Sequence, residues 1–213
     1  MVNKIKSIIF DVGGVLQLGK YSWLAFRRHR STSIHKFMAR KFHINLDQWF
    51  DSIDTAYAEA IEGKISKQKA LSIMAKDLQT SPKYLEKLFI IAYRKYFKRN
   101  DKLFDLAFNL KKKGYQISIL SDQWHVSKEA LMLPKDTRRF NASIVSCDVG
   151  LRKPNLKIYK LALRKLRVSP EDSVFIDNQK WNITPAKKLG MKTILFRKNK
   201  QTIRELKNLG IKI

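Results

Sequence analysis

The stretch Ile8-Ile9-Phe10-Asp11-Val12-Gly13-Gly14 decides how this chain is expected to fold. An apolar run from Lys4 to Phe10, rich in isoleucine, predicts a buried first strand. Asp11 follows this run at once, and the glycine pair indicates that the strand ends in a loop. A carboxylate therefore stands at the carboxyl end of the first predicted strand.

Beyond Asp101 the sequence alternates between helical and strand-like patterns. Helices are predicted at residues 102–113, 124–131, 155–166, 182–189 and 202–209, and strands at 116–120, 142–147, 173–176 and 192–196. Such alternation implies right-handed crossovers and a mainly parallel sheet covered by helices on both faces. The expected fold class is α/β, with a doubly wound, Rossmann-like sheet.

Residues 20–98 have a different pattern, with helical spacing throughout and no strand-like run. Helices are predicted at 33–42, 46–61, 67–78 and 82–96, with breaks at Gly63 and at Ser81-Pro82. The sequence therefore predicts a core domain formed by residues 1–17 and 99–213, and an inserted helical cap formed by residues 18–98.

The charge of the chain is strongly positive. Its 213 residues include 44 Lys and Arg against 18 Asp and Glu, which gives a net charge of +26. Such a charge favours anionic partners, either nucleic acid or a phosphorylated substrate. The excess is spread in short runs, among them 27–30, 111–113 and 197–200, and this spread favours a generally basic composition over a dedicated binding tail.

The remaining composition predicts a packed cytoplasmic protein. Cys147 is the single cysteine, and its apolar surroundings predict a buried thiol in a strand. The N-terminus enters the first strand without the long apolar region of a signal peptide, and no apolar run approaches the roughly 20 residues that a membrane span needs.

Polar side chains stand at the ends of several predicted strands. Asp11, Ser121 and Asp177 each end a strand, and Lys153 lies in the loop after another. Each has an ordinary explanation when taken alone, such as capping the next helix. Ligands of open α/β sheets bind beyond the carboxyl ends of the strands, so the four together predict a site at this edge.

Four segments in this order resemble the motifs of the haloacid dehalogenase superfamily. They are Phe10-Asp11-Val12-Gly13-Gly14-Val15-Leu16, Leu120-Ser121-Asp122, Gly150-Leu151-Arg152-Lys153-Pro154 and Val174-Phe175-Ile176-Asp177-Asn178. Asn182, Ala186 and Gly190 also fit the pattern, and the helical insert falls where that superfamily has its cap. Within it, the chain resembles small sugar-phosphate phosphatases with Asp-x-Gly in the first motif.

This resemblance implies a Mg²⁺-dependent hydrolase of phosphate monoesters that acts on a small phosphorylated metabolite. Asp11 would attack phosphorus and form an aspartyl-phosphate, which requires flanking positive charge. Ser121 and Lys153 would bind phosphoryl oxygens. Mg²⁺ would be held by Asp11, Asp177 and the backbone carbonyl of Gly13, a set of hard oxygen ligands that suits this ion.

Two positions depart from the phosphatase pattern. Gly13 stands where most such phosphatases have a second Asp as general acid and base, a function that contributes about 10²- to 10⁴-fold to the rate. Lys20, His125 and Asp122 are candidates to replace it. Asn178 stands where a second acidic residue is usual, which predicts weaker metal binding, although its oxygen can still contribute to the metal site.

Two alternatives follow from these departures. The 2-haloacid dehalogenases also lack the second Asp and use no metal, but they lack an acidic residue at the position of Asp177, which favours the phosphatase. A different class of function is a catalytically weak, basic module that binds nucleic acid, for which the cluster Arg27-Arg28-His29-Arg30 is the first candidate.

The predicted cap is expected to close over the site and to select the substrate through the turn at residues 62–66. Aromatic residues between Tyr21 and Tyr57 are expected to pack between cap helices. Trp124 and Trp181 follow the second and fourth motifs closely, and either could flank the mouth of the pocket.

Overall fold

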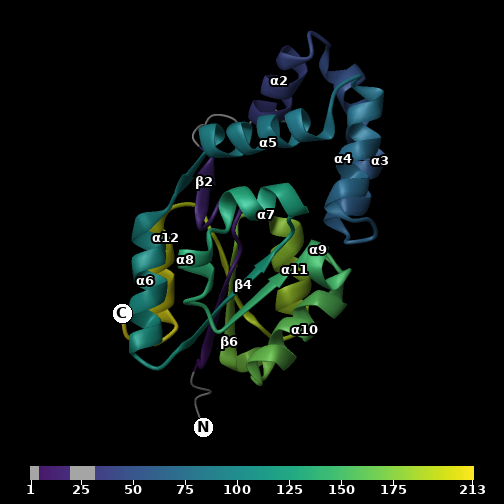
Figure 1. Cartoon of the computed structure of the whole chain (residues 1–213). Helices are drawn as coiled ribbons and strands as arrows, with labels where there is room; N and C mark the ends of the chain where they lie inside the picture. Colours follow the sequence, from purple (N-terminus) through teal and green to yellow (C-terminus); the bar gives the residue numbers. More distant parts are fainter. Residues whose placement is uncertain (1–4, 20–31) are drawn as a thin grey trace.

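The computed structural model describes residues 5–19 and 32–213 and has a single main sheet with a helical insert (Figure 1). The elements that build the main sheet and its covering helices are β1 (Ser7–Phe10), α6 (Asp101–Lys112), β4 (Gln116–Ser121), α7 (His125–Leu131), α8 (Pro134–Thr137), β5 (Ala142–Val145), α9 (Ser146–Val149), α10 (Leu156–Leu166), η1 (Pro170–Asp172), β6 (Ser173–Asp177), α11 (Lys180–Lys188), β7 (Lys192–Leu195) and α12 (Asn199–Asn208). The insert and its stem contain β2 (Gln17–Gly19), α2 (Thr32–Lys41), α3 (Leu46–Ile61), α4 (Lys67–Asp77), α5 (Pro82–Tyr96) and β3 (Phe97–Arg99).

The main sheet has the strand order β5-β4-β1-β6-β7, and every pair in it is parallel. β1 lies in the centre, with Phe10 opposite Ile119 of β4 and opposite Ile176 of β6. All four residues of β1 are buried, as expected for a strand covered on both faces. The predicted α/β fold with a parallel, doubly wound sheet is confirmed.

Alternate side chains of the strands enter two separate hydrophobic cores. Ile8 and Phe10 of β1 face one core, to which α6 and α12 contribute, whereas Ile9 faces the other, beneath α10 and α11. Figure 1 shows these two helix pairs on opposite sides of the sheet. This alternation follows from the two-residue period of a strand.

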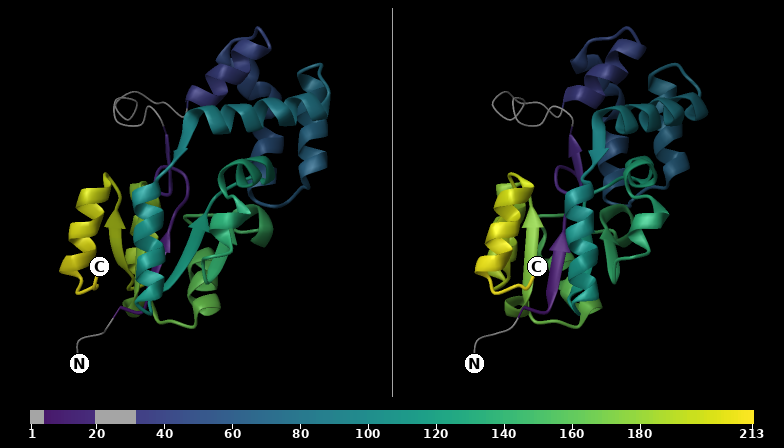
Figure 2. Two further views of the ribbon diagram at one scale, coloured as in Figure 1. Left: turned by 60° about the vertical axis from the view of Figure 1, so that its left-hand side comes forward. Right: turned by 90° about the vertical axis from the view of Figure 1, so that its left-hand side faces the viewer.

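The helical insert rises from a two-stranded antiparallel ribbon formed by β2 and β3 (Figure 2). Its helices α3, α4 and α5 begin at the predicted residues because their first turns are capped. Asn45 and Gln48 form a capping box at the start of α3, and the Ser66 and Ser81 hydroxyls accept backbone N–H bonds at the starts of α4 and α5.

The insert packs directly onto α7 of the core. Trp124, immediately before α7, is fully buried, with its ring 4.8 Å from that of Phe89 in α5, and its Nε1 donates to the Tyr93 hydroxyl at 2.8 Å. The buried side chains of insert and core thus form one continuous cluster. The turn after α3 also touches the core, because a Cβ on Gly63 would lie 2.7 Å from the backbone oxygen of Cys147.

Several sequence expectations need correction. The ribbon strands β2 and β3 were not predicted, because three-residue strands carry no measurable periodicity. The strand expected at 142–147 ends at Val145, and Cys147 is buried in the short helix α9 instead. Trp124 cannot flank a pocket mouth, since it is buried, whereas Trp181 is 62% exposed. Lys20, the cluster Arg27–Arg30 and Tyr21 lie outside the described residues.

Among the described residues, none of the helices has both the length and the apolar character that crossing a membrane requires.

Candidate active site

The three central strands bring the predicted acidic and hydroxyl groups to one edge of the sheet. Asp11 follows β1 directly, and Ser121 and Asp177 are the last residues of β4 and β6, the two neighbours of β1. All three side chains are buried. Parallel strands end at the same edge, so the convergence follows from the topology.

Lys153 joins the two carboxylates. It lies in the loop between α9 and α10, and its Nζ is 2.9 Å from Asp11 Oδ1 and 2.7 Å from Asp177 Oδ2. The Lys153 side chain is 2% exposed, so these contacts are shielded from water. The structure therefore places two carboxylates around one ammonium group, which leaves one unit of excess negative charge in a buried space when all three are ionised.

The electrostatic state of Asp11 reflects this crowding. Burial raises the pKa of Asp11 to about 6, with a further rise from the nearby charge of Asp177, although Lys153 and the Ser121 hydroxyl act in the opposite direction. Burial alone would lower the pKa of Lys153, but the charges of Asp11 and Asp177 outweigh it and raise that pKa above its ordinary value. The ammonium group thus remains charged.

Asp177 is held from two sides. Its Oδ1 accepts a bond from the backbone N–H of Gln179 at 2.7 Å, and its Oδ2 accepts from Asn182 Nδ2 at 3.0 Å as well as from Lys153. Asn182 lies on α11 and was not predicted as a site residue; its position after the fourth motif was the only signal. One carboxylate oxygen of Asp177 therefore accepts a hydrogen bond from the loop before α11, while the other accepts hydrogen bonds from Lys153 and Asn182.

Asn178 lies against the first loop. A Cβ on Gly14 would come within 2.3 Å of Asn178 Nδ2, so glycine at this position, which also has a φ of +84°, lets the amide approach closely. The Oδ1 atom of Asn178 is buried and accepts no hydrogen bond. A free oxygen thus lies beside the loop that carries Asp11 and Gly13.

The residues present fit a magnesium ion. No group of three or more His, Cys, Asp or Glu side chains suited to a metal occurs in the described part of the chain. Mg²⁺ does not need one, because it retains several waters and accepts carbonyl and amide oxygens beside one or two carboxylates. Asp11, Asp177, the Gly13 carbonyl and the unsatisfied Asn178 oxygen form a donor set of this kind, and the excess negative charge favours a cation.

Gln123 is a candidate site residue that the sequence interpretation missed. It is buried, and its Nε2 donates to the Ser121 hydroxyl at 3.2 Å. Its backbone is held by a pair of bonds with the Ser146 hydroxyl, at 3.0 and 3.1 Å. A Cβ on Gly13 would have Gln123 Nε2 as its nearest neighbour, at 3.9 Å. The amide therefore faces the space where the second Asp of the motif would lie.

The candidate replacements for that Asp lie in different places. Asp122 Oδ1 accepts the backbone N–H of Lys153 at 3.0 Å, and burial raises the pKa of its carboxyl. His125 is the first residue of α7, and burial lowers its pKa. Its charged neighbours include Asp148 and Lys128. Neither belongs to the group around Asp11, which consists of Asp11, Ser121, Lys153 and Asp177. Asp122 is thus bonded to a residue of the site, whereas the charged neighbours of His125 lie outside the site.

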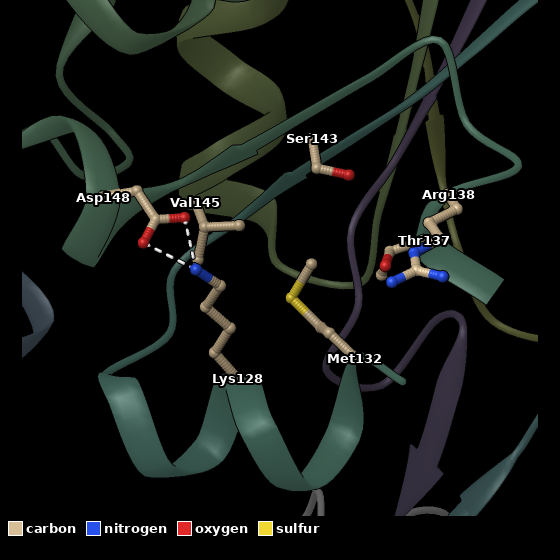
Figure 3. Close-up of a pocket in the computed structure, with 7 residues that line it drawn as sticks. All are labelled: Lys128, Met132, Thr137, Arg138, Ser143, Val145 and Asp148. Carbon is tan, nitrogen blue, oxygen red and sulfur yellow. Dashed lines mark hydrogen bonds and ion pairs between the residues drawn. The ribbon is translucent and has the colours of Figure 1, made fainter. Parts of the chain in front are cut away.

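A separate pocket of roughly 280 Å³ lies between α7, α8, β5 and α9 (Figure 3). It is lined by Lys128, Met132, Thr137, Arg138, Ser143, Val145 and Asp148. Lys128 and Asp148 form an ion pair across it at 2.7 Å. None of its lining residues belongs to the group around Asp11, so this pocket is distinct from the candidate active site.

Comparisons with known proteins identify the family of this chain and several relatives. A family model described as haloacid dehalogenase-like hydrolase matches residues 5–190. Glyceraldehyde 3-phosphate phosphatase of Pyrococcus furiosus is 26% identical over 214 residues, which cover 93% of this chain and 83% of that protein. Bifunctional epoxide hydrolase 2 of Rattus norvegicus is 35% identical over 115 residues, which cover 52% of this chain and only 21% of that protein.

The fold has close structural counterparts. A HAD family enzyme from Bacteroides thetaiotaomicron, crystallised as a magnesium complex, superposes with a TM-score of 0.74 over 94% of this chain and 98% of that one, at 17% sequence identity. The likeness extends through both the sheet and the helical insert, because it covers nearly the whole of each chain.

Proposed function

The chain belongs to the haloacid dehalogenase-like hydrolase family, and from this membership we propose that it is a Mg²⁺-dependent phosphatase that acts on a small phosphorylated metabolite. The observation that supports this most directly is the position of Lys153 Nζ between Asp11 and Asp177 at the carboxyl edge of the sheet. Such an arrangement of a nucleophile, an ammonium group and a second carboxylate suits phosphoryl transfer.

In the proposed reaction, a carboxylate oxygen of Asp11 attacks phosphorus, and the bond from phosphorus to the ester oxygen breaks. The products are an aspartyl-phosphate and the alcohol, and water then releases phosphate and restores Asp11. Lys153 and Ser121 bind phosphoryl oxygens and orient them for in-line attack. The Ser121 hydroxyl accepts a bond from Gln123 Nε2, so its own proton is available to donate to an oxygen of the substrate or of Asp11.

When bound by Asp11, Asp177, the Gly13 carbonyl and Asn178, Mg²⁺ would neutralise charge on the phosphoryl oxygens. Asp177 is positioned for this by its bonds to Gln179 and Asn182, which fix the orientation of its carboxylate. Fixed ligands of this kind reduce the reorganisation needed on binding.

Protonation of the leaving alcohol is expected to be the slow step of the proposed reaction. Gly13 has no side chain to supply it, and Gln123, which faces the empty space, carries an amide that does not ionise. Of the two candidates that the structure describes, Asp122 is the one bonded to a residue of the site, because its carboxylate accepts the backbone N–H of Lys153. We therefore expect a slow enzyme unless the substrate has a good leaving group.

The insert contributes to the proposed selection of substrate. The turn after α3 lies against the loop that leads to Lys153. A Cβ on Gly63 would lie 2.7 Å from the backbone oxygen of Cys147, and a Cβ on Gly150 would lie 3.9 Å from the backbone oxygen of Glu62. Residues of the 62–66 turn are thus near the third motif, where they can contact the part of the substrate beyond the phosphate.

The alternative of a 2-haloacid dehalogenase has less support. Such an enzyme holds no metal ion. The buried carboxylate of Asp177 shares the Lys153 ammonium group with Asp11, so its negative charge would have no second cation to neutralise it. The nucleic-acid alternative is independent of the site's chemistry and rests on the surface charge.

The proposed function can be tested by phosphate release. The wild-type chain should hydrolyse p-nitrophenyl phosphate and some members of a panel of phosphorylated metabolites when Mg²⁺ is present, and EDTA should stop the reaction. Asp11→Asn should abolish turnover while keeping the wild-type melting temperature. Turnover that persists in Asp11→Asn, or release of halide from 2-haloacids without metal, would contradict the proposal.

A further inference from the structure

One face of the core carries a dense set of unpaired cations. It is formed by the outer sides of α10 and α11, and its exposed residues are Lys157, Lys160 and Arg164 of α10 and Lys180, Lys187 and Lys188 of α11. None of the six forms a salt bridge within the described part of the chain. We refer to this surface as the α10–α11 face.

Basic and acidic residues are unevenly divided between these helices and α3 of the insert. Neither α10 nor α11 contains an acidic residue. In contrast, α3 of the insert contains Asp47, Asp51, Asp54 and Glu59 and no basic residue. The cations of α10 and α11 are separated in the sequence by β6 and its flanking loops, so they become neighbours only after folding.

The spacing of the cations suits a linear polyanion. Lys157, Lys160 and Arg164 are three and four residues apart, so they lie along one side of α10 over about 10 Å at the helical rise of about 1.5 Å per residue. α11 lies beside α10 on the same face of the sheet and adds three more cations (Figure 1). Duplex DNA carries about one charge per 1.7 Å of axis, so a face of this size meets several phosphates.

An exposed aromatic side chain accompanies these cations. Trp181 of α11 is 62% exposed and follows Lys180 in the first turn of that helix. Binding surfaces for single-stranded nucleic acids combine cations along the backbone with aromatic rings on which bases stack. Solubility alone would not explain the exposed indole of Trp181 on this face, because an exposed aromatic ring does not increase solubility.

From these observations we infer that the α10–α11 face binds the phosphodiester backbone of nucleic acid, without sequence specificity. A second copy of the chain is the other polymer that could cover it, through the acidic side of α3. A net charge of +26 makes two copies repel each other, whereas it attracts a polyanion. This inference is independent of the proposed phosphatase activity, since none of the six cations contacts the group around Asp11.

The test measures binding of the full chain to fluorescein-labelled RNA, single-stranded DNA and duplex DNA by fluorescence anisotropy over a range of salt. The face variant is Lys157→Gln/Lys160→Gln/Arg164→Gln. The matched control is Lys200→Gln/Arg204→Gln/Lys207→Gln, which removes the same charge from exposed positions on α12, across the sheet. Both variants are checked by thermal melting and by their rate of phosphate release.

We expect wild-type dissociation constants of about 1 to 100 µM at physiological salt, and a slope of log K against log salt that becomes shallower by about 0.9 per lost contact with duplex DNA, or about 0.7 with single strands. The face variant should show this change and bind at least tenfold more weakly, while the α12 control stays near wild type. Trp181→Ala should weaken binding to single strands more than to the duplex.

Three outcomes would overturn the inference. The first is an equal loss in both triple variants, because that would show an effect of net charge alone. The second is binding to vesicles of anionic phospholipid without binding to any nucleic acid. The third is concentration-dependent self-association that the face variant abolishes.

Discussion

Lys153 offsets part of the negative charge of Asp11 and Asp177, and its removal should therefore affect stability as well as activity. Replacing it by Met would leave Asp11 and Asp177 buried without a cation. Removing one partner from a buried ion pair typically costs about 3 to 5 kcal/mol, so we expect Lys153→Met to lower the free energy of unfolding at pH 7 by about 3 kcal/mol.

Urea denaturation measures this effect, and Lys157→Met on the exposed side of α10 is the control, with an expected change within about 0.5 kcal/mol. Added Mg²⁺ should restore part of the lost stability in Lys153→Met, because the ion can neutralise the same carboxylates. Equal stability of the two Met variants in the absence of metal would show that Asp11 and Asp177 do not depend on the ammonium group.

Gly13 offers a way to test whether a missing acid limits the rate. Its backbone has an ordinary φ, and a Cβ there would have nothing nearer than Gln123 Nε2 at 3.9 Å, so a side chain can be accommodated. We expect Gly13→Asp to raise kcat for a substrate with a poor leaving group by about tenfold or more, since general acid catalysis contributes about 10²- to 10⁴-fold when the acid is well placed.

The matched control for this change is Gly13→Asn, which has the same shape but no proton to give, and it should leave kcat near wild type. Steady-state kinetics with an alkyl and an aryl phosphate show whether the new carboxyl group acts as a general acid. The alkoxide is a poor leaving group that needs protonation, whereas the aryl oxide leaves readily without it. If both variants act alike on both esters, the proton comes from elsewhere, and Asp122 becomes the residue to examine.

The site residues that could be predicted from sequence share one property: each stands at the end of a strand or in the loop after one. Asp11, Ser121, Lys153 and Asp177 were predicted to meet, and the structure brings them together. Their catalytic and metal-binding functions stay predictions. Gln123 was missed because its importance depends on which way a loop side chain turns, which no spacing rule reports.

At the scale of helices, α2 and α3 are joined by a hydrogen bond that should make stability depend on pH. Trp49 Nε1 of α3 donates to His35 Nδ1 of α2 at 2.9 Å. Burial lowers the pKa of His35 from 6.5 to about 4. The folded protein therefore holds His35 neutral between these values, where the unfolded chain takes up a proton.

This difference stabilises the unfolded state as the pH falls. The contribution of His35 is constant above pH 6.5 and decreases between about pH 6.5 and 4, by up to about 3 kcal/mol at about 1.4 kcal/mol per pKa unit. We expect His35→Gln, which keeps an acceptor for Trp49, to lose less stability than wild type between pH 7 and 4.5, as measured by urea denaturation. Parallel losses in the two proteins would exclude His35 as the cause.

Helix boundaries could be predicted well where the sequence contains recognisable N-cap residues. The observed ends of α3 and α5 equal the predicted ones, because Asn45 with Gln48 and Ser81 with Pro82 specify the first turns. The ribbon of β2 and β3 could not be predicted. Its strands pair residues 17–19 with 97–99, far apart in sequence, and their stability comes from that pairing.

The distribution of charge over the surface is a property of the whole molecule, and it could not be predicted from the sequence either. The cations of α10 and those of α11 are separated in the sequence, and the α10–α11 face arises only when the two helices pack side by side with their apolar sides on the sheet. Knowing the period of each helix gives its outer side, but not which neighbour it will have.

The continuous core also determines how the molecule should unfold. Trp49 and Phe89 of the insert, Trp124 at the junction and Phe10 of the central strand belong to one buried cluster. We therefore expect insert and core to unfold together, with tryptophan fluorescence and far-ultraviolet circular dichroism giving the same midpoint in urea. Trp124→Ala should lower the free energy of unfolding by about 3 to 5 kcal/mol, because the cavity opens between Phe89, Tyr93 and α7.

Trp181→Ala is the control for this experiment, since the exposed Trp181 contributes little to the core and its loss should change stability by no more than about 0.5 kcal/mol. If the insert instead moved as an independent lid, wild type would show two transitions, and Trp124→Ala would shift only one of them. A single transition in wild type that separates into two in Trp124→Ala would identify this one indole as the link between substrate selection by the insert and the chemistry proposed for the sheet edge.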